Sequence, residues 1–407
     1  MKKVCIFTAD SNGGFPVPAV KDGAVSILVE HLVEQNSKKK ECDLTVVSFY
    51  DEEAEQKAKK YKNVEFRWIK VPPIIKVLDI LVFSFIKILL RNKKANSYKT
   101  ILSLLFYINK SSNILKKEKF DKVVFENNIP LALIIKKSQY KGEYYYHLHN
   151  IPRVNLNCKE VFEKCNGYLC VSNFVGNEIA SNESVIGPIA RDKIHTLYNC
   201  IDTNEFCVKK DSRFLNEIKE KYSIKANEKI LLFVGRLSEE KGIDKILEAL
   251  NLIHDEKFKF LVVGGVMHSS NSKDEYQKKL YNLINANLKN KVLFTGYIKQ
   301  KDLPKYYNIA DIAIMPSMWE EPAGLTMIEA LCCGATLITT KSGGIPEYVS
   351  KYAIILEKDE KLVENMANKI KKLINNMPKK DAVVLNEMYE KYSLDGYMKR
   401  FIDKIVK

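Results

Sequence analysis

A chain of 407 residues is long enough for two domains that each bury a hydrophobic core. Hydrophobic residues make up 46% of it, and with only 12 prolines and 17 glycines the composition excludes a linker or a low-complexity repeat. The nine cysteines form no C-x-x-C pair and follow no secretory signal, so we expect reduced thiols in a cytoplasmic protein rather than a disulfide framework or a zinc site.

The net charge of +15 is concentrated in one segment. Residues 57–141 hold 20 Lys and Arg against 5 Asp and Glu, which equals the excess of the whole chain and leaves the remainder neutral. Such local asymmetry predicts an anionic surface or partner. Nucleic acid is not the expected partner, because no recognition motif and no interleaving of basic with aromatic residues accompanies the charge.

Short apolar segments alternate with amphipathic ones along the whole chain, which is typical of a doubly wound α/β fold. In the first half we predict strands at residues 4–8, 44–49, 122–125, 144–148, 167–171 and 194–198. In the second half we predict strands at 229–234, 259–263, 292–294, 311–315 and 336–339. Helices are expected between them, for example at 24–35, 243–252, 272–287 and 324–333.

The predicted strands fall into two groups, separated where residues 199–206 lead into a charged stretch. We therefore predict a Rossmann-like N-terminal domain over residues 1–203 and a Rossmann-like C-terminal domain over 204–384. Ligands of such folds bind beyond the carboxyl ends of the strands, so a cleft between the domains is the expected site.

Residues 74–90 form a hydrophobic segment that is too short and too charged to be a good membrane span. On a helix, Lys76, Asp79, Ser84 and Lys87 fall within one sector of roughly 140°, which leaves a broad apolar face. Two interpretations remain open. The helix either lies in a membrane interface, where cations meet anionic headgroups, or is buried against its own sheet with the charges on the solvent side.

The stretch EEPAGLTMIEALCCG at 320–334 places two carboxylates, Glu321 and Glu329, on either side of a Pro-x-Gly turn that opens a helix. The free N–H groups at the helix start provide an anion site between two acceptors of hydroxyl groups. A sugar nucleotide has the complementary pattern, a pyrophosphate between two polyhydroxylated groups.

Two further motifs flank this stretch. In FVGRLSEEKG at 233–242, Arg236 and Lys241 lie beside a helix start, where two cations can neutralise a diphosphate. No Asp-x-Asp occurs in the chain, so we expect no metal at this site. In SGGIPE at 342–347 the glycines allow a ligand to approach the backbone closely.

These three motifs, in this order between residues 233 and 347, closely resemble the E-x7-E region of the retaining GT4 glycosyltransferases of bacterial envelope and capsular polysaccharide synthesis. The resemblance implies the GT-B fold, in which two Rossmann-like domains face across a deep cleft and a C-terminal helix, here 385–407, packs back on the first domain. It implies transfer of a hexose or N-acetylhexosamine from a nucleotide sugar, UDP-linked rather than GDP-linked, with no cofactor. The implied acceptor is a saccharide, for example a lipid-linked one at the inner face of the cell membrane.

The resemblance also assigns roles in the second domain. Glu329 accepts both ribose hydroxyls and Glu321 holds a hydroxyl of the donor sugar. The remaining donor contacts implied by the family pattern come from backbone amides, glycine turns and the loop that frames the base: Gly265, Tyr297, Gly324 and Leu325, together with the cations Arg236 and Lys241.

In the first domain the family has a glycine pair that opens a helix; here Asp22 replaces the first glycine and Gly23 retains the close approach to the donor phosphate. The Gly13-Gly14 pair belongs to the acceptor entrance or is a flexible turn. His149 is expected near the reacting sugar, with His147 on the opposite face if the strand continues. Ser172 and Asn199 would line the cleft, although Cys200 stands where the family has glycine.

Three other functions fit the same fold. A GT-B sugar-nucleotide epimerase would need acid and base groups around the donor sugar, and a phosphorylase would need a lysine for pyridoxal phosphate, which we do not identify. A non-catalytic sugar-nucleotide-binding protein would keep its role without Glu321. Outside the three-motif pattern, the two glutamates would be exposed helix acids and the two cations a solvated helix entry.

Overall fold

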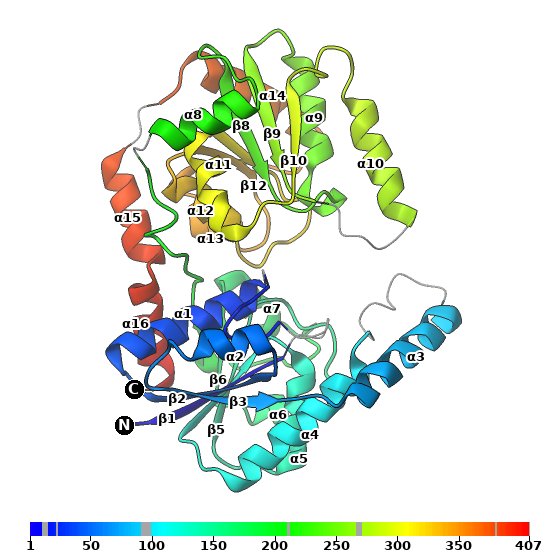
Figure 1. The fold of residues 1–407 in the computed structure, drawn as a ribbon, viewed down its shortest axis with the longest axis vertical. Helices are drawn as coiled ribbons and strands as arrows, with labels where there is room; N and C mark the ends of the chain where they lie inside the picture. Colours follow the sequence, from blue (N-terminus) through cyan, green and yellow to red (C-terminus); the bar gives the residue numbers. More distant parts are fainter. Residues whose placement is uncertain are drawn as a thin grey trace. The chain divides into compact units, whose positions relative to one another are not determined.

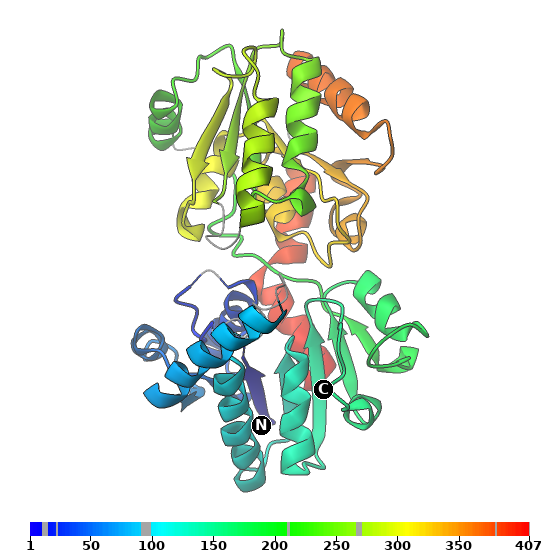
Figure 2. The same cartoon turned by 90° about the vertical axis from the view of Figure 1, so that its right-hand side faces the viewer.

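The computed structural model of this chain describes residues 1–9, 15–21, 23–90, 99–209, 212–265, 271–378 and 381–406. The chain forms two compact units, and Figure 1 shows both. Unit 1 comprises Met1–Asn199 with Leu394–Lys407, and unit 2 comprises Cys200–Ser393. In each unit, helices cover both faces of one parallel sheet, as Figure 2 shows from the side.

The sheet of unit 1 has seven strands in the order β3-β2-β1-β4-β5-β6-β7, all parallel. Its strands are β1 (Lys3–Thr8), β2 (Asp43–Phe49), β3 (Val64–Ile69), β4 (Lys122–Glu126), β5 (Glu143–Leu148), β6 (Gly167–Cys170) and β7 (Ile194–Thr196). Four consecutive apolar residues of the interior strand β1, Val4 to Phe7, are fully buried, because helices cover both faces of the sheet. The strand order reverses between β1 and β4.

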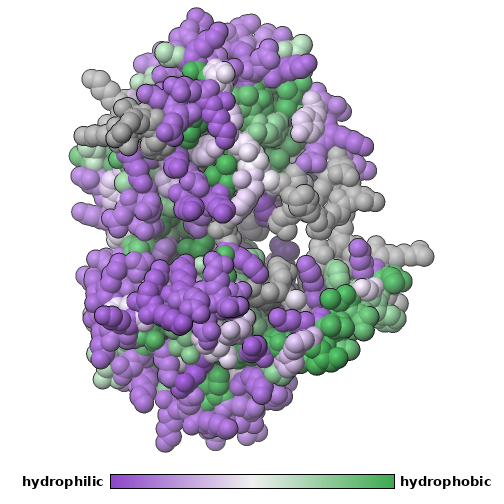
Figure 3. Space-filling view, in the orientation of Figure 1, coloured by the Kyte–Doolittle hydropathy of each residue, from purple (hydrophilic) through white to green (hydrophobic). Residues whose placement is uncertain are grey.

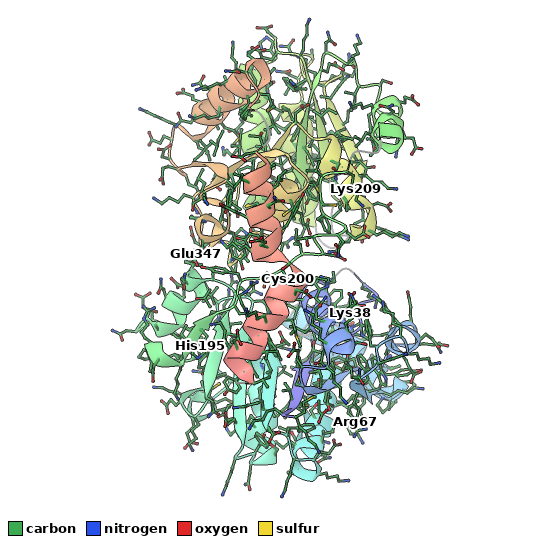
Figure 4. All side chains as sticks on the ribbon, turned by 90° about the vertical axis from the view of Figure 1, so that its left-hand side faces the viewer. Lys38, Arg67, His195, Cys200, Lys209 and Glu347 are labelled. Atoms are coloured by element: carbon green, nitrogen blue, oxygen red, sulfur yellow. The ribbon has the colours of Figure 1, made fainter. Side chains whose placement is uncertain are left out.

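The helices of unit 1 are α1 (Ala24–Lys39), α2 (Glu52–Ala58), α3 (Pro73–Leu90), α4 (Ile101–Lys117), α5 (Ala132–Ser138), α6 (Lys159–Glu163), α7 (Asn173–Ala180) and α16 (Leu394–Ile405). Helix α16 comes from the far end of the chain and packs against α1, with an ion pair of 3.0 Å between Lys39 and Asp395. Figure 4 shows it between the labelled Lys38 of α1 and His195 of β7. Six of its twelve residues are buried.

The sheet of unit 2 has six parallel strands in the order β10-β9-β8-β11-β12-β13. They are β8 (Lys229–Val234), β9 (Phe258–Val263), β10 (Val292–Gly296), β11 (Ile312–Met315), β12 (Thr336–Thr340) and β13 (Ala353–Leu356). The α-helices are α8 (Ser212–Lys221), α9 (Ile243–Leu252), α10 (Asn271–Leu283), α11 (Leu303–Ile309), α12 (Leu325–Cys332), α13 (Ile345–Val349), α14 (Leu362–Asn375) and α15 (Ala382–Tyr392). A core of buried side chains joins α9 and α14 to the strands.

The predicted doubly wound α/β fold is confirmed in both units, with a strand order of the Rossmann type. The sequence interpretation missed two strands, β3 and β13, and both are edge strands. The tail expected at 385–407 as one helix is two, α15 in unit 2 and α16 in unit 1, so the returning helix begins at Leu394. Gly13, Gly14 and Asp22 lie outside the described residues.

The hydrophobic segment at 74–90 is helical, as predicted, and forms α3. Across the part of the chain that the structure describes, no helix combines enough length with enough apolarity to cross a bilayer.

Candidate functional site

The candidate site of unit 2 lies where its strand order reverses, between β8 and β11. The carboxyl ends of these two strands border a small hollow of about 40 Å³. Its lining combines strand ends with the predicted motifs: Phe233, Val234, Gly235, Lys241, Met315, Pro316, Ser317, Glu321, Gly324, Thr326 and Met327. The fold thus brings Lys241, Glu321 and Gly324 together at the point where ligands bind in open α/β sheets.

Glu321 is held by three side chains in this hollow. The Lys241 ammonium donates to both carboxylate oxygens, at 2.7 and 3.1 Å. The Ser317 hydroxyl and the Trp319 indole N–H also donate to Oε2, at 3.1 and 2.9 Å. An acid with four donor contacts in a partly buried position is fixed in orientation, as a group that selects one sugar hydroxyl must be.

The two predicted phosphate cations differ in surroundings. Lys241 ends a short 3-10 helix, Glu239–Lys241, and its ammonium also lies 5.9 Å from the centre of the Trp319 ring. Arg236 precedes that helix, is half exposed, and comes within 3.5 Å of Glu240. Arg236 therefore does not line the hollow, and of these two cations Lys241 is the one that contacts the acidic motif, through Glu321.

Helix α12 begins directly after the Pro-x-Gly turn, as the acidic motif predicts. Gly324 is its N-cap residue and is buried, while Leu325 is half-buried at its first position. The first N–H groups of any α-helix lack partners within the helix, so α12 presents backbone donors at the edge of the hollow.

Glu329 lies on α12 and is buried. Its Oε2 accepts a hydrogen bond of 2.8 Å from the Tyr307 hydroxyl of α11. Burial raises the pKa of Glu329 to about 7, and the Tyr307 hydrogen bond opposes this only in part. A half-ionised carboxyl is thus held at neutral pH where two ribose hydroxyls are expected.

Three glycine-containing loops meet at the carboxyl ends of β8, β9 and β10. The Gly235 N–H donates to the carbonyl of Val263, and the Gly264 N–H donates to the carbonyl of Gly296, at 3.0 and 3.1 Å. Gly265 lies against the Cβ and backbone N of Tyr297, whose side chain is 65% exposed. The predicted Gly265 and Tyr297 are therefore neighbours at this edge, outside the small hollow.

Gly264 is fixed by steric contact. Its φ is +153°, and an added Cβ would lie 1.9 Å from the carbonyl oxygen of Gly235. We expect Gly264→Ala to lower the unfolding free energy by at least about 3 kcal/mol, because two strand-end loops must separate. Gly296→Ala is the control: its φ is +75° but nothing lies near its Cβ, so it should cost only about 1–2 kcal/mol. Urea denaturation compares the two, and equal losses would contradict this explanation.

The SGGIPE motif packs onto the acidic motif through its backbone. The Gly344 N–H donates to the Glu321 carbonyl at 2.7 Å, and the Gly343 N–H donates to the Glu320 carboxylate. Gly343 has a φ of +49°, and a Cβ there would lie 2.3 Å from the Glu321 carbonyl oxygen. The close contact at Gly343 is thus with the chain itself, and the approach of a ligand at these glycines stays a prediction.

In unit 1 a polar cluster lies beside the corresponding point of strand reversal. Glu126 ends β4 and pairs in register with His147 of β5. Its carboxylate lies 3.1 Å from His147 Nδ1 and 3.0 Å from His149 Nε2. Our expectation that the two histidines face opposite sides is wrong, because residues two apart along a strand point to the same face, and both rings lie against the Glu126 carboxylate.

The turn after β5 is held by Asn127. Its side-chain oxygen accepts from the backbone N–H groups of His149 and Asn150, at 2.9 and 3.1 Å. Asn127 itself has a φ of +51°, a conformation that asparagine tolerates. The two imidazole ring centres come to lie 4.1 Å apart as a result.

Burial and the contacts between the three side chains determine which of them are ionised at neutral pH. Burial opposes ionisation of Glu126, but His147 and His149 outweigh it and lower the pKa of Glu126 to about 2. Burial, followed by the charge of His147, lowers the pKa of His149 to about 4. At neutral pH His149 is therefore neutral and donates its Nε2–H to an ionised Glu126, which leaves Nδ1 as an acceptor.

We expect the folded state to lose stability as the pH falls from about 6.5 to about 4. In this window the unfolded chain binds a proton at residue 149 and the folded chain does not, so protons favour unfolding, by up to about 3 kcal/mol. His149→Asn should flatten this part of the curve of melting temperature against pH. The matched control is His254→Asn at a partly exposed site. A parallel shift of the His149→Asn curve would contradict the assignment.

The same three side chains are, among the residues that the structure describes, the one group whose ligand atoms lie close enough together for a metal ion, within 4.8 Å of one another. Hydrogen bonds between the rings and the carboxylate account for that spacing without an ion. The absence of a metal requirement stays a prediction.

The other predicted residues of unit 1 have structural neighbours that explain their types. Gly23 is the N-cap residue of α1, and a Cβ there would meet the Phe15 ring at 2.8 Å. The Ser172 hydroxyl caps α7 by accepting from the Val175 N–H at 3.2 Å. Asn199 is buried at the end of unit 1.

Sequence reasoning missed four residues that shape these sites: Glu126, Tyr307, Ser317 and Trp319. Trp319 stands one residue before the acidic motif and Glu126 directly follows a predicted strand, so both positions carried a signal. Tyr307 carried none, because its partner Glu329 lies on another helix. Ser317 stands only four residues before Glu321, but no motif marked it.

Comparison with known proteins gives the following. Residues 215–390 match the family described as "Glycosyl transferases group 1". Spore coat protein SA of Bacillus subtilis (strain 168) is 29% identical over 251 residues, 58% of this chain and 64% of that protein. Lipopolysaccharide 1,2-N-acetylglucosaminetransferase of Salmonella typhimurium (strain LT2) is 30% identical over 150 residues, 36% of this chain and 39% of that protein. The matches thus span less than two thirds of these relatives.

Among solved structures, Anabaena Alr3699/HepE in complex with UDP and glucose is similar to this chain with a TM-score of 0.71. The alignment covers 99% of both chains at 16% sequence identity. At that identity the likeness concerns the fold, which is GT-B.

Proposed function

Because the chain belongs to the group 1 glycosyltransferases, the GT4 family, whose members act with retention, we propose that it is a retaining glycosyltransferase. Its donor is a UDP-linked hexose or N-acetylhexosamine. Two relatives support this choice: the structure of HepE contains UDP and glucose, and the Salmonella protein is named as an N-acetylglucosaminetransferase.

The observation that carries the proposal is the pairing of Lys241 with Glu321 in the hollow at the strand reversal of unit 2. In this proposal the Lys241 ammonium leaves Glu321 and pairs with the diphosphate of the donor. Arg236 and the first backbone amides of α12 complete the anion site without a metal. Glu321 is then released to accept from a hydroxyl of the donor sugar, and Glu329 accepts from the ribose. Tyr297 frames the base beside Gly265.

The proposed reaction is a front-face substitution. The bond between the anomeric carbon and the diphosphate oxygen breaks while the acceptor oxygen bonds to the same face of that carbon. The acceptor's proton passes to the departing phosphate oxygen, so the enzyme needs no covalent nucleophile. In this mechanism the largest contribution of the protein to lowering the activation barrier is the stabilisation of the leaving diphosphate by cations.

Unit 1 supplies the remaining proposed contacts. His149, kept neutral by its burial and oriented by its hydrogen bond to Glu126, offers its Nδ1 as an acceptor for a hydroxyl of the reacting sugar. Gly23 allows the diphosphate to approach α1, and Ser172 and Asn199 contribute near the donor. We propose a saccharide acceptor, lipid-linked and reached at the inner face of the cell membrane, as in cell-envelope polysaccharide synthesis.

A panel of UDP-, GDP- and ADP-sugars tests the proposal by thermal shift and by hydrolysis of the donor. We expect stabilisation and slow hydrolysis with one UDP-sugar, unchanged after dialysis against EDTA. Stabilisation without hydrolysis or transfer to any saccharide would indicate a binding protein, and interconversion of two UDP-sugars would indicate an epimerase. Loss of activity in EDTA, restored by a divalent ion, would refute the metal-free site.

A further inference from the structure

Helix α3 turns its apolar side chains away from the protein. Phe85 is 66% exposed and Ile88 is 77% exposed, whereas most large apolar side chains of unit 1 are buried. Seven residues of α3 are exposed in this way: Ile74, Val77, Leu78, Ile80, Leu81, Phe85 and Ile88. Figure 3 shows them as a continuous hydrophobic surface on the arm formed by α3. A contiguous patch of this kind on one helix marks a surface that binds something.

The rotation of α3 about its axis is fixed by Asp79. This residue is buried, and its carboxylate accepts from the backbone N–H groups of Leu102 and Ser103, at 2.7 and 3.1 Å. It thereby caps the N-terminus of α4, where a negative charge is favourable. Our alternative of a helix buried against its own sheet, with the charges on the solvent side, is wrong: an acid faces inward and the apolar residues face outward.

Cations lie beside this apolar face. Lys76 and Lys87 are exposed on α3 itself. Between the residues that lead into α3 and helix α4, a surface hollow of about 450 Å³ is lined by Lys70, Lys110 and Lys117 beside the Trp68 and Phe106 rings, with Glu118 as its one acid. Over residues 70–90 and 99–117 the chain has seven lysines and a single acid, the buried Asp79. An apolar surface with a cationic border is complementary to a bilayer with anionic headgroups.

We propose that α3 and the adjoining lysine-rich face of α4 dock the protein on an anionic lipid bilayer. Helix α3 lies in the plane of the interface, with Leu81 and Phe85 inserted among the acyl chains and the lysines at the phosphates. Its 18 residues give an inserted length of roughly 27 Å. The inference goes beyond the proposed function, since it holds whichever sugar is transferred.

Charge also argues against a second copy of this chain as the occupant. A symmetric dimer through α3 would pair this surface with a copy of itself, so Lys76 and Lys87 would meet apolar residues and other lysines in a nonpolar interface. Each cation would lose water without gaining an acid, whereas a lipid phosphate supplies the missing charge.

The test is co-sedimentation of the full chain with phosphatidylcholine vesicles that contain or lack phosphatidylglycerol. We expect binding to the phosphatidylglycerol vesicles that weakens at high salt, and little binding to phosphatidylcholine alone. Leu81→Ser/Phe85→Ser should weaken binding at least about 100-fold. Lys76→Glu/Lys87→Glu should weaken it at least about 20-fold, from roughly fivefold per lysine.

The matched controls carry the same types of exchange, large apolar residue to Ser and Lys to Glu, on exposed residues of unit 2. They are Leu252→Ser/Val383→Ser and Lys289→Glu/Lys299→Glu, and both should bind vesicles like the unmodified chain. All variants should melt at the same temperature and keep the UDP-sugar thermal shift, which separates loss of docking from loss of fold or of the donor site.

Two results would overturn the proposal. One is no binding to phosphatidylglycerol vesicles, or equal binding by the Leu81→Ser/Phe85→Ser variant. The other is a concentration-dependent dimer in sedimentation that this variant abolishes while vesicles leave it intact, which would assign the face to a second copy.

Discussion

Glu321→Gln is expected to lower kcat/KM for sugar transfer about 100-fold to 1,000-fold while leaving the affinity for UDP unchanged or higher. The substitution keeps the size of the side chain and removes its charge. In the empty protein Lys241 donates to both carboxylate oxygens of Glu321, so a neutral partner frees this ammonium for the diphosphate. The sugar hydroxyl, in contrast, loses its charged acceptor in the transition state.

Steady-state kinetics and UDP titration calorimetry measure the two effects separately. The matched control is the adjacent Glu320→Gln. Glu320 pairs with Lys358 and with the Gly343 N–H and is more than half exposed outside the hollow, so transfer should stay within about threefold. Equal losses in both variants, or loss of UDP affinity in Glu321→Gln, would contradict the assigned role.

Glu329→Gln is expected to stabilise the empty protein at pH 8 and to weaken UDP binding at least about tenfold. Burial raises the folded pKa of Glu329 to about 7, above its ordinary value of 4.5. Its stabilising contribution is therefore complete below pH 4.5 and is lost as the pH rises through 7. At pH 8 the buried charge costs up to about 3 kcal/mol, which a neutral glutamine avoids.

Melting temperatures at pH 5 and pH 8, with and without UDP, test this prediction. The melting temperature of the variant should equal that of the unmodified chain at pH 5 and exceed it at pH 8. UDP affinity of the unmodified chain should fall below pH 7, because in the proposed site both ribose hydroxyls donate to an ionised Glu329 carboxylate. Tyr307→Phe removes the one hydrogen bond that lowers this pKa, so it should move that fall to higher pH. A Gln variant that is less stable at pH 8 would refute the account.

The fold was predictable wherever a strand is buried on both faces. β1, β8 and β11 are continuous apolar runs in the centre of their sheets, and the sequence interpretation identified them within one residue. β3 reads Val-Glu-Phe-Arg-Trp-Ile, with charged residues on an edge strand that is only half-buried. β13 is the edge of the other sheet and has four residues. Edge strands lack the two-sided burial that makes strands visible in a sequence.

The site was predictable where its residues are close together in the sequence. The two glutamates and the α12 start lie within one motif, and the structure keeps them together. The sequence did not reveal that Tyr307 contacts Glu329 or that Glu126 holds both histidines, because those contacts join different elements. Asp79 of α3 likewise depends on amides 23 residues later in the chain. Long-range pairing of this kind overrides helical periodicity, so the outward face of α3 had to be observed.

Helix α16 gives unit 1 a particular order of assembly during synthesis. Its buried residues, among them Tyr397, Phe401 and Ile405, complete a unit whose other elements all precede Cys200. A ribosome adds about 5–20 residues per second, so roughly 10–40 s pass between the end of the first segment and the arrival of α16. Unit 2 has already emerged by then. Until α16 has been synthesised, the first half of the nascent chain therefore exposes the face of α1 that α16 later covers, and chaperones can bind there.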